Sequence, residues 1–398
     1  MRKHRLEASQ LHVGAPLHFD VFDADGRLLL RRGNRISSEL QLERLIQQGI
    51  FSSLASEGDG TGPESGPFAA ETEVRPRALH DASVFKTFDR CSRRLDELCN
   101  GPVTAGEAMT FMTDVGILVE NIQRACEYES DASLAYILLG SAASYPVRQQ
   151  INVAILTALM LGRVAPASLR EHSAMAATLT MNIGMFALQE ELYCASVPLS
   201  ETQRATLRQH PDSGAQLLRQ RGVDDLAWLE IVTQHHEALD GSGYPLGLKG
   251  EAICREAQII AVADRYSGMV SERAYRPGLA PDVVLNEIHR RHARALDAGL
   301  IRLLIKTLGP YPPGTVVTLA NKEVGVVTRR LLDLKHPIVR TFFVDPLWPY
   351  EVPRKRFTAS MPQFAIAGVL PRSAVAGCID PEQLWSPGRV EERDDGDG

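Results

Sequence analysis

Apolar residues recur at helical spacing through the middle of the chain. The segments FKTFDRCSRRLDELC, AMTFMTDVGILVENIQRAC and VAILTALMLGRV carry them every three to four positions, with few β-branched alternations. This period is typical of helices that bury one face. The pattern therefore predicts one all-helical domain over residues 83–309.

Two β-rich segments flank the helical region. The first, LHFDVFDADGRLLLRRGNRI, alternates in places and is interrupted by the turn dipeptides DG and GN. A short helix over residues 39–48 is expected to follow it. The second contains the β-branched runs of TVVTLANKEVGVVTRR and HPIVRTFFVD, separated by NK and by Pro337. Small β modules are therefore predicted at residues 1–54 and 310–388.

Two further segments lack the apolar residues that a core requires. Residues 55–82 are rich in Gly, Pro, Ser and Glu, and residues 389–398 are acidic and Gly-rich. The first is predicted to be a flexible linker and the second a disordered tail. The expected fold class is thus a multidomain, mainly α protein whose all-helical domain lies between β-rich N-terminal and C-terminal modules.

Charge and hydropathy exclude two classes of partner. The 43 Lys and Arg residues are outnumbered by 49 Asp and Glu, giving a formal charge of -6, so no nucleic-acid partner is expected. The longest apolar stretch, residues 153–161, is too short for a membrane span, and no signal-peptide pattern follows the N-terminus. The six cysteines form no CxxC pair, which argues against a disulfide framework. These features predict a cytoplasmic protein.

One motif near the end of the helical region carries recognisable chemistry. In HHEALDGSGYP, two adjacent imidazoles at a helix end can direct lone pairs toward a metal ion, and two glycines allow a tight turn. The string resembles the HHExxDGxGYP signature of the HD-GYP family, bacterial hydrolases that open cyclic di-GMP. The matching residues are His235, His236, Glu237, Asp240, Gly241, Gly243, Tyr244 and Pro245.

The resemblance covers roughly residues 84–310 and implies a helical HD-domain fold. By this resemblance His210, in LRQHPDSG, and Asp264, in AVADRYSG, would be metal ligands beside His235 and His236. Relatives use iron, manganese or other divalent ions. Tyr244, Arg273 and Arg276 stand where relatives contact the bound dinucleotide.

Several positions depart from the family pattern. The HDIGK block corresponds to Met181-Asn182-Ile183-Gly184-Met185, so its His, Asp and Lys are absent. The His of the family's HSxNVA helix is Gln149, and Tyr145 stands where some relatives have a ligating Glu. An amide lacks the charge of a bridging carboxylate, and a thioether is a poor exchange for an imidazole.

These losses predict that no intact catalytic set remains, because hydrolysis needs a metal-bound hydroxide. No cofactor is expected, unless an iron or manganese ion binds at His210, His235, His236 and Asp264. The leading hypothesis is a non-catalytic protein of cyclic di-GMP signalling that binds the nucleotide or a partner such as a diguanylate cyclase through the GYP loop. The alternatives are a weak phosphodiesterase that uses the remaining ligands, and a scaffold that binds neither.

Simpler readings of single residues stay open at this point. His210 could be a helix-surface residue before an exposed proline, and Asp264 could pair with Arg265 or Arg273. Arg273 and Arg276 could be solvated surface charges. Met181 and Met185, at i and i+4, could pack together on one face of a helix.

Overall fold

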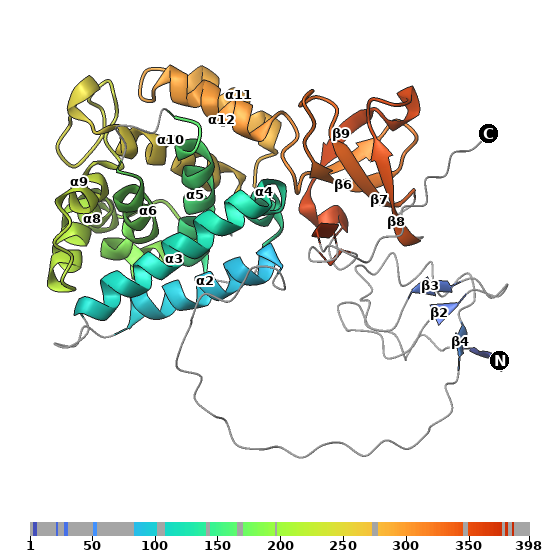
Figure 1. Cartoon of the computed structure of the whole chain (residues 1–398), viewed down its shortest axis with the longest axis horizontal. Helices are drawn as coiled ribbons and strands as arrows, with labels where there is room; N and C mark the ends of the chain where they lie inside the picture. The colour runs from blue at the N-terminus through green and yellow to red at the C-terminus, as the bar shows by residue number, and fades with distance from the viewer. Residues whose placement is uncertain are drawn as a thin grey trace, which may run out of the picture.

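The computed structural model of this chain describes residues 3–5, 21–22, 28–30, 51–53, 83–101, 108–140, 144–164, 170–195, 197–272, 278–344, 349–375, 379–380 and 384–385. A large helical domain and a C-terminal β-sheet lie side by side (Figure 1). The predicted helix at residues 39–48, the linker at 55–82 and the tail at 389–398 lie outside the described residues.

The helical domain begins at Val84 and ends at Leu308, which confirms its all-helical character. Its helices are α2 (Val84–Asn100), α3 (Ala108–Tyr128), α4 (Ser130–Leu139), α5 (Tyr145–Leu161), α6 (Glu171–Thr180), α7 (Phe186–Cys194), α8 (Glu201–Gln220), α9 (Leu226–Gln234), α10 (Arg255–Val270), α11 (Pro281–Arg291) and α12 (Ala298–Leu308). Two short 3-10 turns, η4 (Ile183–Met185) and η5 (Gly250–Ala252), interrupt them.

Helix α5 is the centre of this domain. It contacts α2, α3, α4, α6, α7, α10 and α12, and nearly all of its side chains are buried. Its sequence, YPVRQQINVAILTALML, explains the position, because a helix that is apolar on every side must be enclosed. By contrast α2 is amphipathic, and it buries Phe88 and Leu95 while its charged residues face solvent. The site described below is built around α5.

The C-terminal sheet has five antiparallel strands in the order β8-β7-β6-β5-β9. They are β5 (Val316–Leu319), β6 (Val324–Arg329), β7 (Ile338–Phe343), β8 (Pro349–Phe357) and β9 (Ile366–Leu370). The β5–β6 turn contains Lys322 at φ 72°, and β7 starts directly after Pro337, as the sequence predicted. One face of the sheet buries Val317, Leu319, Val327 and Val339 as a small core.

A second sheet lies in the N-terminal region. Its strands β1 (Lys3–Arg5), β2 (Val21–Phe22), β3 (Leu28–Leu30) and β4 (Phe51–Ser53) pair antiparallel in the order β1-β4-β2-β3. They agree with the β-rich character predicted for residues 1–54. None of the described helices is both long and apolar enough to cross a membrane.

The C-terminal sheet is fixed to the helical domain by buried polar contacts. Arg330, at the end of β6, forms an ion pair with Asp131 of α4 at 2.5 Å, and both side chains are only 11% exposed. Arg330 also donates to Ser130 Oγ at 3.0 Å and to the carbonyl of Thr307. The rings of Phe85 and Trp385 stack with their centroids 5.7 Å apart. The last described residues therefore return to the start of α2.

Candidate metal centre and GYP loop

Helix α9 positions the paired histidines. Its N-terminus is capped by Asp225, whose carboxylate accepts from the backbone N–H groups of Ala227 and Trp228 at 2.9 and 3.1 Å. The helix ends at Gln234, so His235 and His236 follow its last turn, as the motif predicted. The chain then leaves the helix and forms the GYP loop, residues 237–249.

Glu237 organises this loop. Its buried carboxylate accepts three backbone N–H groups, from Leu246 at 2.6 Å, Gly247 at 3.1 Å and Leu248 at 2.8 Å. Hydrogen bonds to an ionised carboxylate are among the stronger ones in proteins. The motif glutamate therefore supports the loop and is not directed at a metal ion.

The motif glycines are required by close packing. A Cβ atom on Gly243 would lie 2.3 Å from the backbone nitrogen of Ala238, and Gly241 adopts φ 82°. Asp240 accepts from the backbone N–H and the hydroxyl of Ser242 at 3.0 and 2.6 Å. The loop thus turns back on α9, and the Tyr244-Pro245 peptide is cis.

Three histidines come together beneath the loop. One ring nitrogen from each of His210, His235 and His236 lies within 4.8 Å of the others, and among the described residues no carboxylate oxygen belongs to this group. His210 lies in α8, which continues through Pro211, and both residues are buried. The reading of His210 as a surface residue before an exposed proline is therefore wrong.

The protonation of two of these rings is fixed by the backbone. Nδ1 of His210 is 2.6 Å from the carbonyl of Leu207, and Nδ1 of His235 is 2.6 Å from the carbonyl of Val232. A carbonyl only accepts, so each Nδ1 carries the proton and each Nε2 presents a lone pair. Burial is the larger cause that lowers the pKa of both rings to about 3, and repulsion from a neighbouring imidazole is the second. Both rings are therefore neutral at pH 7.

The two Nε2 atoms of His210 and His235 face each other at 3.1 Å. Two lone pairs at this distance repel unless a cation lies between them. Imidazoles bound to one transition-metal ion at about 2.0–2.1 Å have their nitrogens roughly 3.0–3.4 Å apart. The histidine cluster, His210, His235 and His236, therefore fits one divalent ion. Among the described residues no carboxylate belongs to this group, so its donors are neutral imidazoles.

Asp264 is bound to an amide. Nε2 of Gln149 donates to Oδ1 of Asp264 at 2.9 Å, and Oε1 of Gln149 accepts from the hydroxyl of Ser267 at 3.0 Å. The alternative pairing of Asp264 with Arg265 does not occur in the described structure, where Arg265 is exposed and its side chain makes no such contact. The sequence identified Gln149 and Asp264 but not the Gln149–Asp264–Ser267 chain of hydrogen bonds.

The block at Met181-Asn182 lies at a break between helices. Helix α6 ends at Thr180 and η4 follows, so Met181 and Met185 do not share one helix face, and that reading is wrong. Met181 is fully buried in the hydrophobic core. Asn182 is 2% exposed, and its Oδ1 has no hydrogen-bond partner among the described residues.

Two aromatic rings pack together at the N-terminal end of α5. The rings of Tyr145 and Tyr193 stack at 4.7 Å, and the guanidinium of Arg148 lies 5.7 and 5.6 Å from their centroids. Tyr145 is 3% exposed. The position that some relatives use for a glutamate ligand is therefore part of a packed aromatic pair.

Tyr244 covers the histidine cluster. Its ring centroid lies 4.9 Å from that of His236 and 6.2 Å from that of His210. Burial and the charge of Asp264 raise the pKa of the Tyr244 phenol, and attraction from Arg265 and Arg208 opposes this rise. The sequence had offered Arg265 only as a partner of Asp264, and it had not pointed to Arg208. Arg273 and Arg276 lie outside the described residues.

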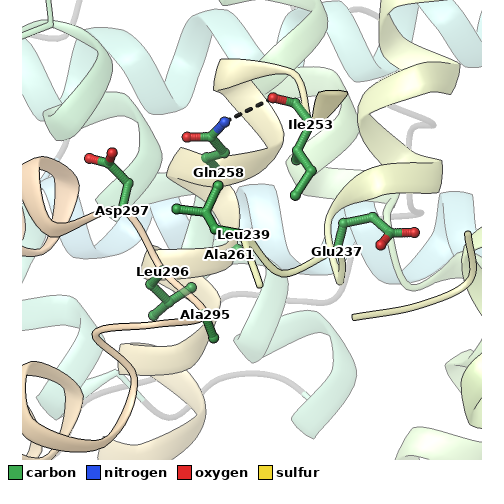
Figure 2. A pocket seen from close by; sticks show the side chains of 8 residues that line it. All are labelled: Glu237, Leu239, Ile253, Gln258, Ala261, Ala295, Leu296 and Asp297. Atoms are coloured by element: carbon green, nitrogen blue, oxygen red, sulfur yellow. Dashed lines mark hydrogen bonds between the residues drawn. The ribbon is translucent and has the colours of Figure 1, made fainter. Parts of the chain in front are cut away.

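A small cavity lies between the GYP loop and α10 (Figure 2). At about 10 Å³ it has room for roughly one water molecule. It is lined by Glu237, Leu239, Ile253, Gln258, Ala261, Ala295, Leu296 and Asp297. None of the three clustered histidines lines it, and it is far too small for a nucleotide.

Comparison with known proteins matches residues 138–300 to the HD domain family. This range includes the GYP loop, the histidine cluster and the Gln149–Asp264 pair. Residues 138–300 are thus an HD domain that carries the HD-GYP signature. Its relatives include a cyclic di-GMP phosphodiesterase from Pseudomonas aeruginosa, 28% identical over 287 residues, which cover 71% of this chain and 66% of that protein.

A second relative of this chain is the cyclic di-GMP phosphodiesterase response regulator RpfG from Xanthomonas campestris. It is 27% identical over 190 residues, which cover 47% of each protein. The chain thus spans between about half and two thirds of the length of these relatives. A solved HDGYP-type protein from Bdellovibrio bacteriovorus aligns with a TM-score of 0.47 at 15% identity, over 77% of this chain and 99% of that one.

Proposed function

We propose that this HD-GYP protein acts in cyclic di-GMP signalling by binding and does not hydrolyse the dinucleotide. The relatives named above are cyclic di-GMP phosphodiesterases, which supports the signalling context. The GYP loop keeps its full signature and its internal hydrogen bonds. A binding surface can persist in this loop while the metal ligands beneath it are replaced.

The hydrogen bond between Gln149 and Asp264 carries this proposal. The amide N–H of Gln149 donates to Oδ1 of Asp264 at 2.9 Å, so this carboxylate oxygen already has a hydrogen-bond partner within the protein. Ser267 holds the same amide in its orientation from the other side. Opening Asp264 toward a metal would break this hydrogen-bonded chain, and Gln149 offers only a neutral amide in place of a further imidazole.

The histidine cluster would hold at most one divalent ion, iron or manganese. Such an ion, when bound, supplies positive charge that polarises a phosphate and acidifies water. The residues of this chain contribute neutral Nε2 donors from His210 and His235, whose rings are oriented by backbone carbonyls. Met181 and Asn182 are buried and offer only a thioether and a neutral amide, so they provide no anionic ligand for the second ion of a two-metal site.

Two ligands are compatible with a binding role. Cyclic di-GMP would lie against Tyr244, with Arg208 and Arg265 near its phosphates. A diguanylate cyclase domain would contact the outer side of the GYP loop, where Leu246 is 61% exposed. Apolar side chains at the centre of an interface contribute much of the binding energy.

Calorimetric titration of the purified chain with cyclic di-GMP, combined with chromatography of the nucleotide afterwards, tests the first ligand. Saturable binding with unchanged nucleotide is expected, and Tyr244→Ala should weaken it by about tenfold. Tyr128→Ala removes an exposed tyrosine far along α3 and should have no effect. Steady appearance of the linear dinucleotide would overturn the non-catalytic role.

Binding to a purified diguanylate cyclase domain tests the second ligand. Leu246→Glu should abolish a complex that forms through the GYP loop, because it places a charge in the apolar contact. Leu226→Glu changes a leucine at the start of α9 that is 77% exposed, and it should leave the complex intact. A chain that binds neither the cyclase domain nor cyclic di-GMP would be a scaffold, and the proposed function would be wrong.

A weak metal-dependent phosphodiesterase is the second candidate. The facing Nε2 atoms of His210 and His235 favour it, since they are arranged to hold an ion. Turnover that requires added iron or manganese and disappears in His235→Ala would establish this activity. Turnover that survives His235→Ala would come from a contaminating enzyme.

A further inference from the structure

Strands β6, β7 and β8 gather basic residues on one face of the C-terminal sheet. Val326 is directly opposite Arg340, and Arg340 is directly opposite Lys355. Residues that face each other across antiparallel strands project to the same side. Arg329 is paired with Ile338, two positions before Arg340 on β7, at an irregularity in the β6–β7 register, and its charge acts on Arg340.

Arg340 has no counter-charge in the described structure. Its side chain is about half buried and makes no ion pair or hydrogen bond with any described residue. Burial is the larger cause that lowers the pKa of Arg340, and repulsion from Arg329 is the second. A guanidinium in this position is destabilised unless an anion joins it.

The opposite face of the same sheet carries an arginine whose charge is compensated. Arg356 makes two hydrogen bonds of 2.8 Å to the carboxylate of Glu323, which is buried, and its guanidinium lies 4.7 Å from the ring centroid of Phe364. Arg356 is therefore paired inside the protein. Arg340, one strand away and on the other face, has no such carboxylate.

The neighbours of Arg340 leave the face positively charged. Arg329 has one contact of 3.5 Å with Glu129, in which the arginine side chain is 59% exposed. The ammonium of Lys355 is exposed and lies 5.0 Å from the ring centroid of Phe357. Residues 310–375 contain nine Lys and Arg against four Asp and Glu, although the whole chain has a formal charge of -6. The positive charge is thus concentrated in this module.

We propose that Arg329, Arg340 and Lys355 form a binding site for the phosphate group of a dissolved phosphate compound. A planar guanidinium matches two phosphate oxygens, and a lysine adds charge at the rim. The half-buried position of Arg340 favours a compact, doubly charged anion. This site lies on the sheet, outside the histidine cluster and the GYP loop, and it does not rest on the proposed function.

Calorimetric titration of the full-length chain with sodium pyrophosphate at low ionic strength tests this site. We expect saturable binding that weakens as salt is added. Arg340→Met keeps the apolar stem but removes the guanidinium, and it should weaken binding by at least about tenfold. Arg354→Gln removes one charge from the other face of β8, where Arg354 lies 4.3 Å from the Tyr350 ring centroid, and should change binding by less than about twofold.

Three outcomes would overturn the proposal. The first is the absence of saturable heat with pyrophosphate. The second is equal binding by the wild type and Arg340→Met. The third is a loss of binding in His235→Ala but not in Arg340→Met, which would assign the anion to the histidine cluster.

The same phosphate chemistry occurs in lipid headgroups, so a second arm uses vesicles of phosphatidylcholine with and without phosphatidylglycerol. Sedimentation of the chain only with the anionic vesicles, without pyrophosphate binding, would replace the dissolved ligand by a membrane surface and overturn the proposal as stated. Pyrophosphate binding that depends on Arg340, with no vesicle binding, supports it.

Discussion

Nε2 of Gln149 on α5 lies 2.9 Å from Oδ1 of Asp264 on α10, so an amide hydrogen atom occupies the carboxylate beside the histidine cluster. The same amide accepts from Ser267 one turn further along α10. The Gln149–Asp264 hydrogen bond joins α5 to α10 through two residues that are 115 positions apart in the sequence. In this protein the carboxylate beside the histidine cluster is thus paired with an amide of the protein itself.

This link can be opened by substitution. Gln149→His combined with Asn182→Asp should raise the metal content from at most one ion per chain to between one and two, because it frees Asp264 and restores an imidazole and a carboxylate. Elemental analysis after loading with manganese measures the change. Gln149→Leu combined with Asn182→Asp frees Asp264 without adding an imidazole and is the matched control. Equal metal content in both variants would contradict the role given to Gln149.

His235 should determine whether any metal binds. His235→Ala removes one of the two facing Nε2 donors, so bound iron or manganese should fall to background, a change of more than about tenfold. The exposed His289 of α11 provides the control, and His289→Ala should retain the wild-type metal content. If the wild type itself carries no metal after loading, the cluster is not a metal site.

Two glycines of the loop region should differ in their tolerance of a methyl group. Gly243→Ala places a Cβ 2.3 Å from a backbone nitrogen and should lower the free energy of unfolding by about 3 kcal/mol. Gly250→Ala meets no atom within 4 Å, and only its φ of 52° opposes the change, so the loss should be about 1 kcal/mol. Urea unfolding compares the two. Equal losses would mean that close packing does not constrain Gly243.

The carboxylate of Glu237 should protect the loop amides. Glu237→Gln removes the charge that accepts from Leu246, Gly247 and Leu248, and should cost about 2 kcal/mol of local stability. Hydrogen exchange at these three amides should accelerate by about thirtyfold. Glu251→Gln, an exposed glutamate in η5, should leave their exchange unchanged. Unchanged protection in Glu237→Gln would show that other contacts hold the loop.

The buried pair Arg330–Asp131 should fasten the sheet to the helices. Asp131→Ala leaves a guanidinium that is 11% exposed without its carboxylate, so the free energy of unfolding should fall by about 3–5 kcal/mol. Glu97→Ala breaks the exposed pair with Arg94 and should cost less than about 1 kcal/mol. Chemical unfolding followed by tryptophan fluorescence measures both. Similar losses in the two variants would argue against a special role for the buried pair.

Features encoded over short stretches of sequence were predictable. The helical period located the helical domain, and the turn at Lys322 and the start of β7 after Pro337 followed from local chemistry. The contiguous motif placed His235 and His236 at the end of a helix. Each of these depends on residues that are close together in the chain, so the sequence contains the whole signal.

Contacts between distant segments were not predictable in the same way. The burial of His210 and Pro211 depends on how α8 packs against α9 and η4, which no local pattern specifies. Arg330 and Asp131 are 199 residues apart, and neither stands in a motif. The sequence alone gives no reason to single out Arg340 within its strand. Only the pairing of the strands shows that it lies beside other cations.

The stacking of Phe85 on Trp385 brings the beginning of the helical domain next to the last described residues of the C-terminal part. The two ends of this unit meet, so a short peptide could join them, and the chain could instead be opened at an exposed turn such as the one at Lys322. Such a circular permutant would keep every helix and strand of the unit in place. We therefore expect that the fold of this unit does not depend on which of its two parts comes first in the chain.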